Sequence, residues 1–250
     1  RAVPLDPQAV QRAAQLKMQI SEQQARLTAL EQRAREAAVK RAGNQEDVPL
    51  GPQPYAAWNF QVDLSDQVGE LDVTLIGGAK RDAEGLVLDG KGAFARSKRL
   101  SKPLSEKTLE AWVRVTDLDQ RGGGVISLQT SDGLVFDAIV FGEREPKRWM
   151  AGSDGFTRTE AFEASDETDN ESLVHVAITY STEGAITGYR NGVPYGRAYK
   201  KNLPTFAAEN SELVFGLRHG VEAGGNRMFQ GTVAQARLYD RALTPEEVAT

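Results

Sequence analysis

The chain contains no cysteine in its 250 residues, and it has two histidines. The lack of cysteine excludes disulfide bonds, thiolate nucleophiles, cysteine-based zinc sites and covalent haem attachment within these residues. His175 and His219 stand far apart in the sequence, so the short spacing of a paired-histidine metal motif is missing. We therefore predict no metal site and no cofactor.

The chain also lacks a long apolar run and an initiator methionine. No stretch stays apolar over the roughly 20 residues that a membrane-spanning helix needs, and no signal peptide is recognisable. The chain begins with Arg1 and ends at Thr250, just after a helix-start signal. We therefore expect a piece of a longer protein, with no membrane span in this piece.

Charge is distributed unevenly along the chain. The net charge is −5, yet residues 7–42 are basic, so the acidic excess lies in residues 43–250. Nucleic-acid binding depends on cationic contacts to phosphate, and an acidic domain therefore argues against a nucleic-acid partner. The basic charges before residue 43 are spread around a predicted helix, which is typical of a solvated face.

Residues 1–43 are predicted to form one long helix. Asp6 can cap its first turn, Pro7 suits the first helical position, and Gly43 suits its end. Apolar and small residues recur at alternating steps of three and four over about four heptads. This seam fits a self-associating coiled coil, or a helix packed on its own domain or on another part of a parent chain. A proline-containing linker is expected over 44–54.

From Tyr55 onward the hydrophobic pattern alternates with a period of two. Short alternating runs follow one another, separated by Gly, Asn and Asp turns, and Asn191-Gly192 is a strong two-residue hairpin turn. We predict an all-β domain over residues 55–250, folded as a two-sheet antiparallel sandwich. Thr244–Glu247 reads as a capping box that begins a short helix.

Several segments carry a family resemblance in the right order: LDG (88–90), TLEAWVRV (108–115), VHVAITY (174–180), YRNG (189–192), LVFGL (213–217) and FQGTVAQARLYDRALTPEEV (229–248). Together they resemble the laminin-G-like jelly roll of the concanavalin A-like lectin/glucanase superfamily, over roughly residues 55–248. The resemblance implies a jelly-roll fold. It also implies a module of a large secreted bacterial multidomain protein, and hence an extracytoplasmic (periplasmic or secreted) location.

Two positions depart from the family pattern. Leu173 stands where the family usually has tryptophan, and Val233-Ala234 replaces a pair that usually contains aspartate. The loss of that acidic side chain puts in doubt any metal or polar role that it has in other members.

The stretch DETDNE at 166–171 resembles the Glu-x-Asp-x-Glu strand of glycosidases in this superfamily. On a strand, Glu167, Asp169 and Glu171 would share one face. The intervening Thr168 and Asn170 are polar, so such a strand would have no buried face to hold the carboxylates in position. We therefore predict a solvated acidic loop rather than a catalytic strand, and no catalytic residues.

The strand LEAWVRV offers the strongest candidate ligand site. Its apolar residues alternate with Glu110, Trp112 and Arg114, which should share the opposite face. A tryptophan between charges can stack on a sugar or a partner, although a loop or the N-terminal helix could equally cover Trp112. Trp149 and Tyr195 lie near predicted turns and are further candidates if exposed. His175 fits a hydrogen-bonded structural role.

These observations predict a non-catalytic binding or interaction module, with carbohydrate as the ligand class. The alternative is a structural spacer that organises neighbouring modules of a larger protein. A glucanase is the least favoured interpretation, because the carboxylate stretch lacks an apolar anchor. Other modules of a parent protein are expected partners.

Overall fold

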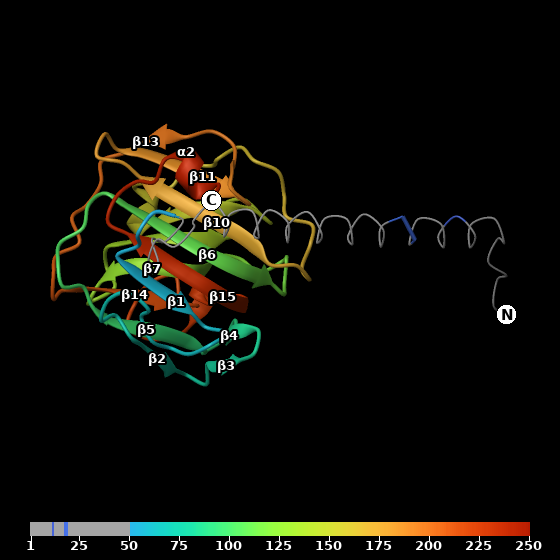
Figure 1. Cartoon of the computed structure of the whole chain (residues 1–250), viewed down its shortest axis with the longest axis horizontal. Helices are drawn as coiled ribbons and strands as arrows, with labels where there is room; N and C mark the ends of the chain where they lie inside the picture. The colour runs from blue at the N-terminus through green and yellow to red at the C-terminus, as the bar shows by residue number, and fades with distance from the viewer. Residues whose placement is uncertain (1–11, 13–17, 20–50) are drawn as a thin grey trace, which may run out of the picture. The chain divides into compact units, whose positions relative to one another are not determined.

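The computed structural model describes residues 51–250, together with residues 12, 18 and 19 (Figure 1). The predicted helix over 1–43, its coiled-coil seam and most of the 44–54 linker lie outside the described residues, so they stay predictions. Residues 51–250 form one compact unit. Among the described residues, no helix is long and apolar enough to cross a membrane.

A nine-stranded antiparallel sheet forms one layer of the sandwich (Figure 1). Its main path runs β12-β11-β10-β6-β15-β4-β3, while β1 pairs with β15 and β13 pairs with β11. The strands are β1 (Ala56–Asn59), β3 (Lys80–Asp82), β4 (Gly85–Asp89), β6 (Lys107–Val115), β10 (Val174–Tyr180), β11 (Ala185–Arg190), β12 (Val193–Pro194), β13 (Tyr199–Lys200) and β15 (Gln230–Tyr239).

A six-stranded antiparallel sheet forms the second layer, in the order β2-β5-β14-β7-β8-β9. Three short helices, η1, η2 and α2, complete the described elements. The strands are β2 (Val73–Ile76), β5 (Phe94–Arg99), β7 (Gly123–Thr130), β8 (Phe136–Phe141), β9 (Trp149–Ser153) and β14 (Ser211–Phe215); the helices are η1 (Asp154–Phe156), η2 (Gly225–Arg227) and α2 (Pro245–Val248).

The core lies between the two sheets, because alternate residues of each strand point inward. On β6, Leu109, Ala111 and Val113 are fully buried and belong to the main hydrophobic core. Trp58 packs edge-to-face on Phe215 with ring centroids 5.1 Å apart. The predicted all-β two-sheet antiparallel sandwich is therefore confirmed, and its architecture is that of a jelly roll.

Two local structures predicted from short sequence signals, a hairpin turn and a capping box, are present in the fold. Asn191 and Gly192 both have positive φ, at 51° and 74°, and join β11 to β12. The Thr244 side chain accepts a hydrogen bond from the Glu247 backbone N–H, and the Glu247 side chain accepts one from the Thr244 N–H, which completes a capping box. Short-range rules were sufficient here because each turn is determined by its own residues.

Candidate functional site

The outer face of the nine-stranded sheet brings Glu110, Trp112 and Arg114 together on β6, as the alternation predicts. Glu110 is nevertheless buried, and neighbouring strands satisfy its carboxylate. His175 Nε2 lies 2.7 Å from Oε1, and the Tyr239 hydroxyl donates to Oε2 at 3.1 Å. Burial and the nearby Glu110 charge raise the pKa of Tyr239 to about 12, so its hydroxyl keeps the proton that it donates. The Glu110 carboxylate is therefore engaged within the protein.

Trp112 is also engaged by its neighbours. Its ring stacks on His175 of β10 at a centroid separation of 4.6 Å, and the Arg237 guanidinium of β15 lies 4.6 Å from the ring centroid. Because β10 and β15 flank β6 on opposite sides, these side chains approach the indole from opposite flanks. Arg114 is paired with Glu84. The predicted trio thus offers neither a free ring face nor a free carboxylate.

Trp149 and Tyr195 are buried, so the exposure that would make them ligand-binding candidates is not met. Trp149 lies within β9, is 1% exposed, and donates from Nε1 to Glu167 Oε1 at 2.7 Å. The Tyr195 hydroxyl donates to the Ser165 carbonyl at 2.9 Å. Both polar tips are therefore satisfied inside the protein, and their aromatic bodies belong to the core.

The acidic stretch 166–171 forms a loop and no strand, as predicted. The prediction that the whole stretch is solvated is wrong at Glu167, whose carboxylate is buried and receives two hydrogen bonds from Arg190, at 2.6 and 2.8 Å. Asp169 and Glu171 are exposed, and Asp169 accepts from the Glu171 backbone N–H at 2.8 Å. With one carboxylate buried and two in solvent, the three do not share a cleft.

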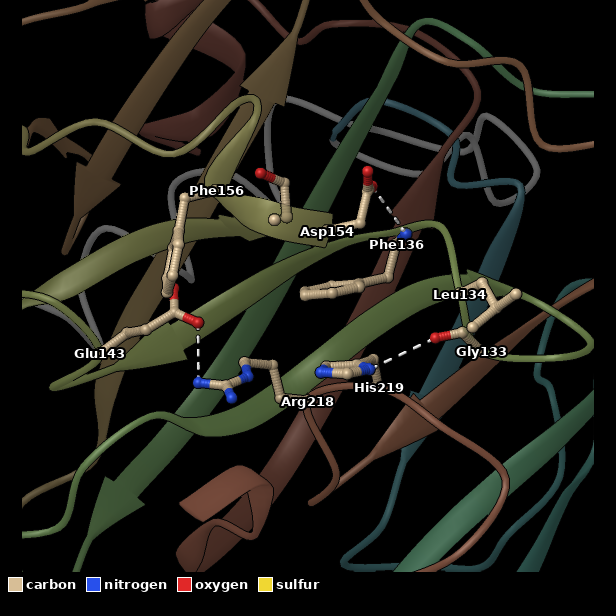
Figure 2. Close-up of a pocket in the computed structure, with 10 residues that line it drawn as sticks. Gly133, Leu134, Phe136, Glu143, Asp154, Phe156, Arg218 and His219 are labelled. Atoms are coloured by element: carbon tan, nitrogen blue, oxygen red, sulfur yellow. Dashed lines mark hydrogen bonds and ion pairs between the residues drawn. The ribbon is translucent and has the colours of Figure 1, made fainter. Parts of the chain in front are cut away.

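A hollow of about 250 Å³ opens on the outer face of the six-stranded sheet (Figure 2). Phe136, the first residue of β8, faces outward there and stacks on His219, with ring centroids 4.4 Å apart and planes nearly parallel at 8°. Segments distant in the sequence meet at this point: the turn before β8, the end of β8, the end of β9 with η1, and the chain after β14. The lining residues are Gly133, Leu134, Phe136, Glu143, Ser153, Asp154, Gly155, Phe156, Arg218 and His219.

A buried ion pair lies beside the stacked rings. Arg218 Nη1 is 2.7 Å from Glu143 Oε1, and the two side chains are 10% and 4% exposed. Burial raises the pKa of Glu143 despite the adjacent guanidinium. Among the described residues, Glu143 Oε2 and Arg218 Nε have no hydrogen-bond partner. Burial and the charges of Arg218 and Arg227 lower the pKa of His219, so its ring is neutral near pH 7. The hollow therefore combines apolar walls with polar atoms at its base that can still form a hydrogen bond.

Exposed apolar side chains form the rim of the hollow. Phe156 is 48% exposed and Leu134 is 71% exposed. Gly155 and Phe156 have positive φ, at 54° and 59°, within η1. The left-handed backbone is unfavourable for a bulky residue, and it holds the Phe156 ring beside the Glu143 carboxylate (Figure 2). The Arg144 guanidinium lies 5.4 Å from the Phe156 ring centroid.

A run of glycines at 122–124 makes room for the ion pair. A Cβ on Gly124 would lie 2.2 Å from the Arg218 Cα, and one on Gly122 would lie 2.4 Å from Arg218 Nη1. The glycines therefore allow the chain around Arg218 to rest directly on β7. The three glycines stand together in the sequence, and their role of admitting an arginine appears only with the fold.

None of the five predicted ligand-binding residues lines the hollow. The sequence signals that could have pointed to it are the turn-forming Ser153-Asp154-Gly155 before an aromatic residue, and the glycine run that faces Arg218. Neither signal connects the two segments by itself. Among the described residues, no group of three or more His, Asp or Glu side chains is arranged to hold a metal ion.

Comparison with protein families gives a match over residues 89–249 to the model described as the concanavalin A-like lectin/glucanases superfamily. No curated protein matches the chain. The family match spans most of the described sandwich, from the end of β4 to α2.

Solved structures with the same fold come from several organisms. Domain 4 of AbnA, a GH43 extracellular arabinanase from Geobacillus stearothermophilus solved with arabinotriose, is 21% identical, with a TM-score of 0.63 over 80% of this chain and 98% of that one. Trypanosoma rangeli sialidase with sialic acid is 16% identical, with a TM-score of 0.56 over 90% of this chain and 38% of the sialidase. The binding domain of botulinum neurotoxin serotype G is 14% identical, with a TM-score of 0.54 over 79% and 50%. At these identities the likeness is one of fold.

Proposed function

Because the chain belongs to the concanavalin A-like lectin/glucanases superfamily, we propose that it is a non-catalytic carbohydrate-binding module whose site is the hollow on the six-stranded sheet. One observation carries the proposal: a half-exposed aromatic ring, Phe156, stands over a concave surface with a buried ion pair at its base. Carbohydrate sites combine aromatic surface with a few placed polar groups.

The ring of Phe156 supplies the apolar surface, on which the C–H face of a sugar ring can pack. Leu134, on the rim, extends that surface. Hydroxyl groups of the same sugar would meet Asp154, whose side chain is 28% exposed. The hollow is smaller than the roughly 300–1,000 Å³ typical of pockets for drug-sized ligands, so we propose that it takes a short part of an oligosaccharide.

The engagement of both carboxylates in the hollow supports a binding role rather than hydrolysis. A glycosidase uses one carboxyl group as acid and a second as nucleophile or base. Glu143 is paired with Arg218 at 2.7 Å, and Asp154 accepts from Arg158 Nη2 at 2.5 Å. Both carboxylates are therefore already engaged by arginines within the protein, and the pKa of Asp154 is lowered by its arginine partner, which disfavours it as a proton donor to a leaving group.

The arabinanase domain with the same fold was solved with arabinotriose, and this supports a short neutral oligosaccharide as the first ligand to test. We expect arabino-oligosaccharides, or another glycan found by array screening, to bind in isothermal titration. Replacing the ring in Phe156→Ala should weaken binding about tenfold, or ~1.4 kcal/mol.

Val193→Ala is the matched control, because Val193 is 62% exposed on β12 of the other sheet. Its affinity should equal that of the unaltered chain. Absence of binding across the array, or equal losses in both variants, would contradict the proposed site. Hydrolysis products accumulating during the titration would contradict the non-catalytic role.

A further inference from the structure

A second buried polar cluster lies between the two sheets, apart from the hollow's opening. Lys107 begins β6 of the nine-stranded sheet, and Asp137 lies on β8 of the six-stranded sheet. Both side chains are fully buried, and Lys107 Nζ lies 2.8 Å from Asp137 Oδ2. The rings of Tyr180 and Phe206 stand 4.3 and 5.1 Å from the same nitrogen. An amine and a carboxyl group thus meet in a place that water does not reach.

Burial acts strongly on this lysine. It lowers the pKa of Lys107 even though the Asp137 charge acts in the opposite direction. Two separated charges in a buried place are costly, because each has lost its hydration. Transfer of one proton from the ammonium to the carboxylate removes both charges and leaves a neutral amine, which is a nucleophile, against a carboxylic acid.

Arg158 donates a hydrogen bond to the same carboxyl group. Its Nε donates to Asp137 Oδ1 at 2.8 Å, and its Nη2 donates to the Phe136 carbonyl at 3.0 Å and to Asp154 Oδ1 at 2.5 Å. Negative charge that develops on Oδ1 during attack would therefore meet a fixed donor. The Arg158–Asp154 pair stays balanced in charge after Lys107 and Asp137 have become neutral.

We propose that Lys107 and Asp137 condense into an intramolecular isopeptide bond that ties the two sheets together. The Lys107 nitrogen attacks the Asp137 side-chain carbonyl carbon, and Oδ2 leaves as water. The three protons of the ammonium are all accounted for: one stays on the amide nitrogen and two leave with the oxygen. Oδ1 becomes the amide oxygen and keeps its hydrogen bond from Arg158. No oxidant, reductant or further reactant is needed.

The bond would serve as a cross-link in a chain that has no cysteine. It would join strands of opposite sheets, as a disulfide does in other sandwiches, and close the segment from residue 107 to residue 137. The inference is independent of the proposed carbohydrate site, because neither Lys107 nor Asp137 lines the hollow.

The intact mass of the purified, denatured chain tests the proposal directly. We expect a mass lower than that of the sequence by one water molecule. Proteolytic mapping should then find the segments around Lys107 and Asp137 joined, with trypsin failing to cut after Lys107. A chain of full mass overturns the proposal without any variant having to fold. A missing water that maps to an aspartate–glycine sequence, such as Asp132-Gly133, overturns it too.

Two variants sharpen the result. Lys107→Arg keeps the charge but has no primary amine, so its mass should be that of its full sequence. Asp137→Asn can form the same amide by losing ammonia, so its mass should fall by one ammonia rather than one water, with the same peptides joined. A mass deficit of one water in Lys107→Arg would show that another residue pair is responsible.

Discussion

The two outer faces of the sandwich carry similar kinds of side chain but expose them differently. The nine-stranded face presents Glu110 and Trp112, whereas the six-stranded face presents Glu143 and Phe156. Glu110 and Trp112 are each engaged by side chains of adjacent strands. Glu143 keeps one carboxylate oxygen without a partner among the described residues, and Phe156 keeps half of its surface in solvent.

The difference comes from the neighbours and not from the residues themselves. On the nine-stranded face, β10 and β15 place long side chains at the register positions beside β6, and these fill the surface. On the six-stranded face, β7 and β9 contribute Gly124 and Gly152, and the space that side chains would take there is occupied by the Arg218 backbone and the Val140 side chain. The hollow on that face is lined by Leu134 and Phe156, which stay exposed, so whether an aromatic residue beside a carboxylate is covered depends on its neighbours.

We call the nine-stranded face the closed face, because neighbouring side chains cover Glu110 and Trp112, and the six-stranded face the open face. The largest expected effect is on the stability that the closed face provides. Glu110→Ala removes the shared partner of His175, Tyr239 and Arg237, and it leaves the buried Tyr239 hydroxyl and the His175 ring nitrogen without this partner. We expect a loss of about 3 kcal/mol in the free energy of unfolding, measured by urea denaturation. Carbohydrate affinity of the folded fraction should be unchanged. A loss below ~0.5 kcal/mol would mean that the closed face does not depend on this carboxylate.

Replacing each of the two aromatic residues by alanine, one at a time, should separate the effect on stability from the effect on binding. Trp112→Ala should lower the free energy of unfolding by about 2 kcal/mol, because a packed ring is lost, while leaving carbohydrate affinity intact. Phe156→Ala should weaken carbohydrate binding, while its melting temperature stays close to that of the unaltered chain. Calorimetry and titration of both variants check this comparison. If Trp112→Ala abolished binding in a folded protein, the ligand would lie on the nine-stranded face instead.

Glu143, the buried carboxylate of the open face, should make the free energy of unfolding depend on pH. Because the pKa of Glu143 is raised by burial, the folded state holds this proton more tightly than the unfolded state. The resulting stabilisation is fully present below the unfolded pKa and is lost as pH rises through the folded pKa. Relative to Glu143→Gln, the unaltered chain should therefore gain stability as pH falls toward 4 in thermal unfolding. A difference that is constant with pH would contradict the shift.

The smallest effect concerns α2, which packs on the closed face through Val248 beside Tyr189 and Tyr239. Hydrogen bonds from Arg241 and the Thr244 N–H lower the pKa of Glu247 to about 2. Its stabilisation is present above the ordinary glutamate pKa and is lost as pH falls toward 2. Glu247→Gln should cost roughly 0.5–1 kcal/mol near pH 7 and almost nothing near pH 2. Equal costs at both pH values in urea titrations would contradict this role.

The sequence by itself determined the features that depend on neighbours along the chain. Strict alternation predicted the sandwich and the outward face of β6. Two adjacent residues predicted the Asn191-Gly192 turn, four predicted the capping box of α2, and the polar Thr168 and Asn170 predicted a loop rather than a catalytic strand. In each case the energy that decides the conformation acts between residues a few positions apart.

Tertiary structure alone decided which polar and aromatic side chains are covered. Glu167 is buried because Arg190 and Trp149, both distant in sequence, converge on its carboxylate, and Tyr195 is buried in the same region. The hollow likewise exists because segments around Phe136, Phe156 and Arg218 meet on one sheet face. Burial is a property of the atoms that surround a side chain, and in a sandwich of antiparallel strands most of those atoms come from strands and loops far away along the chain.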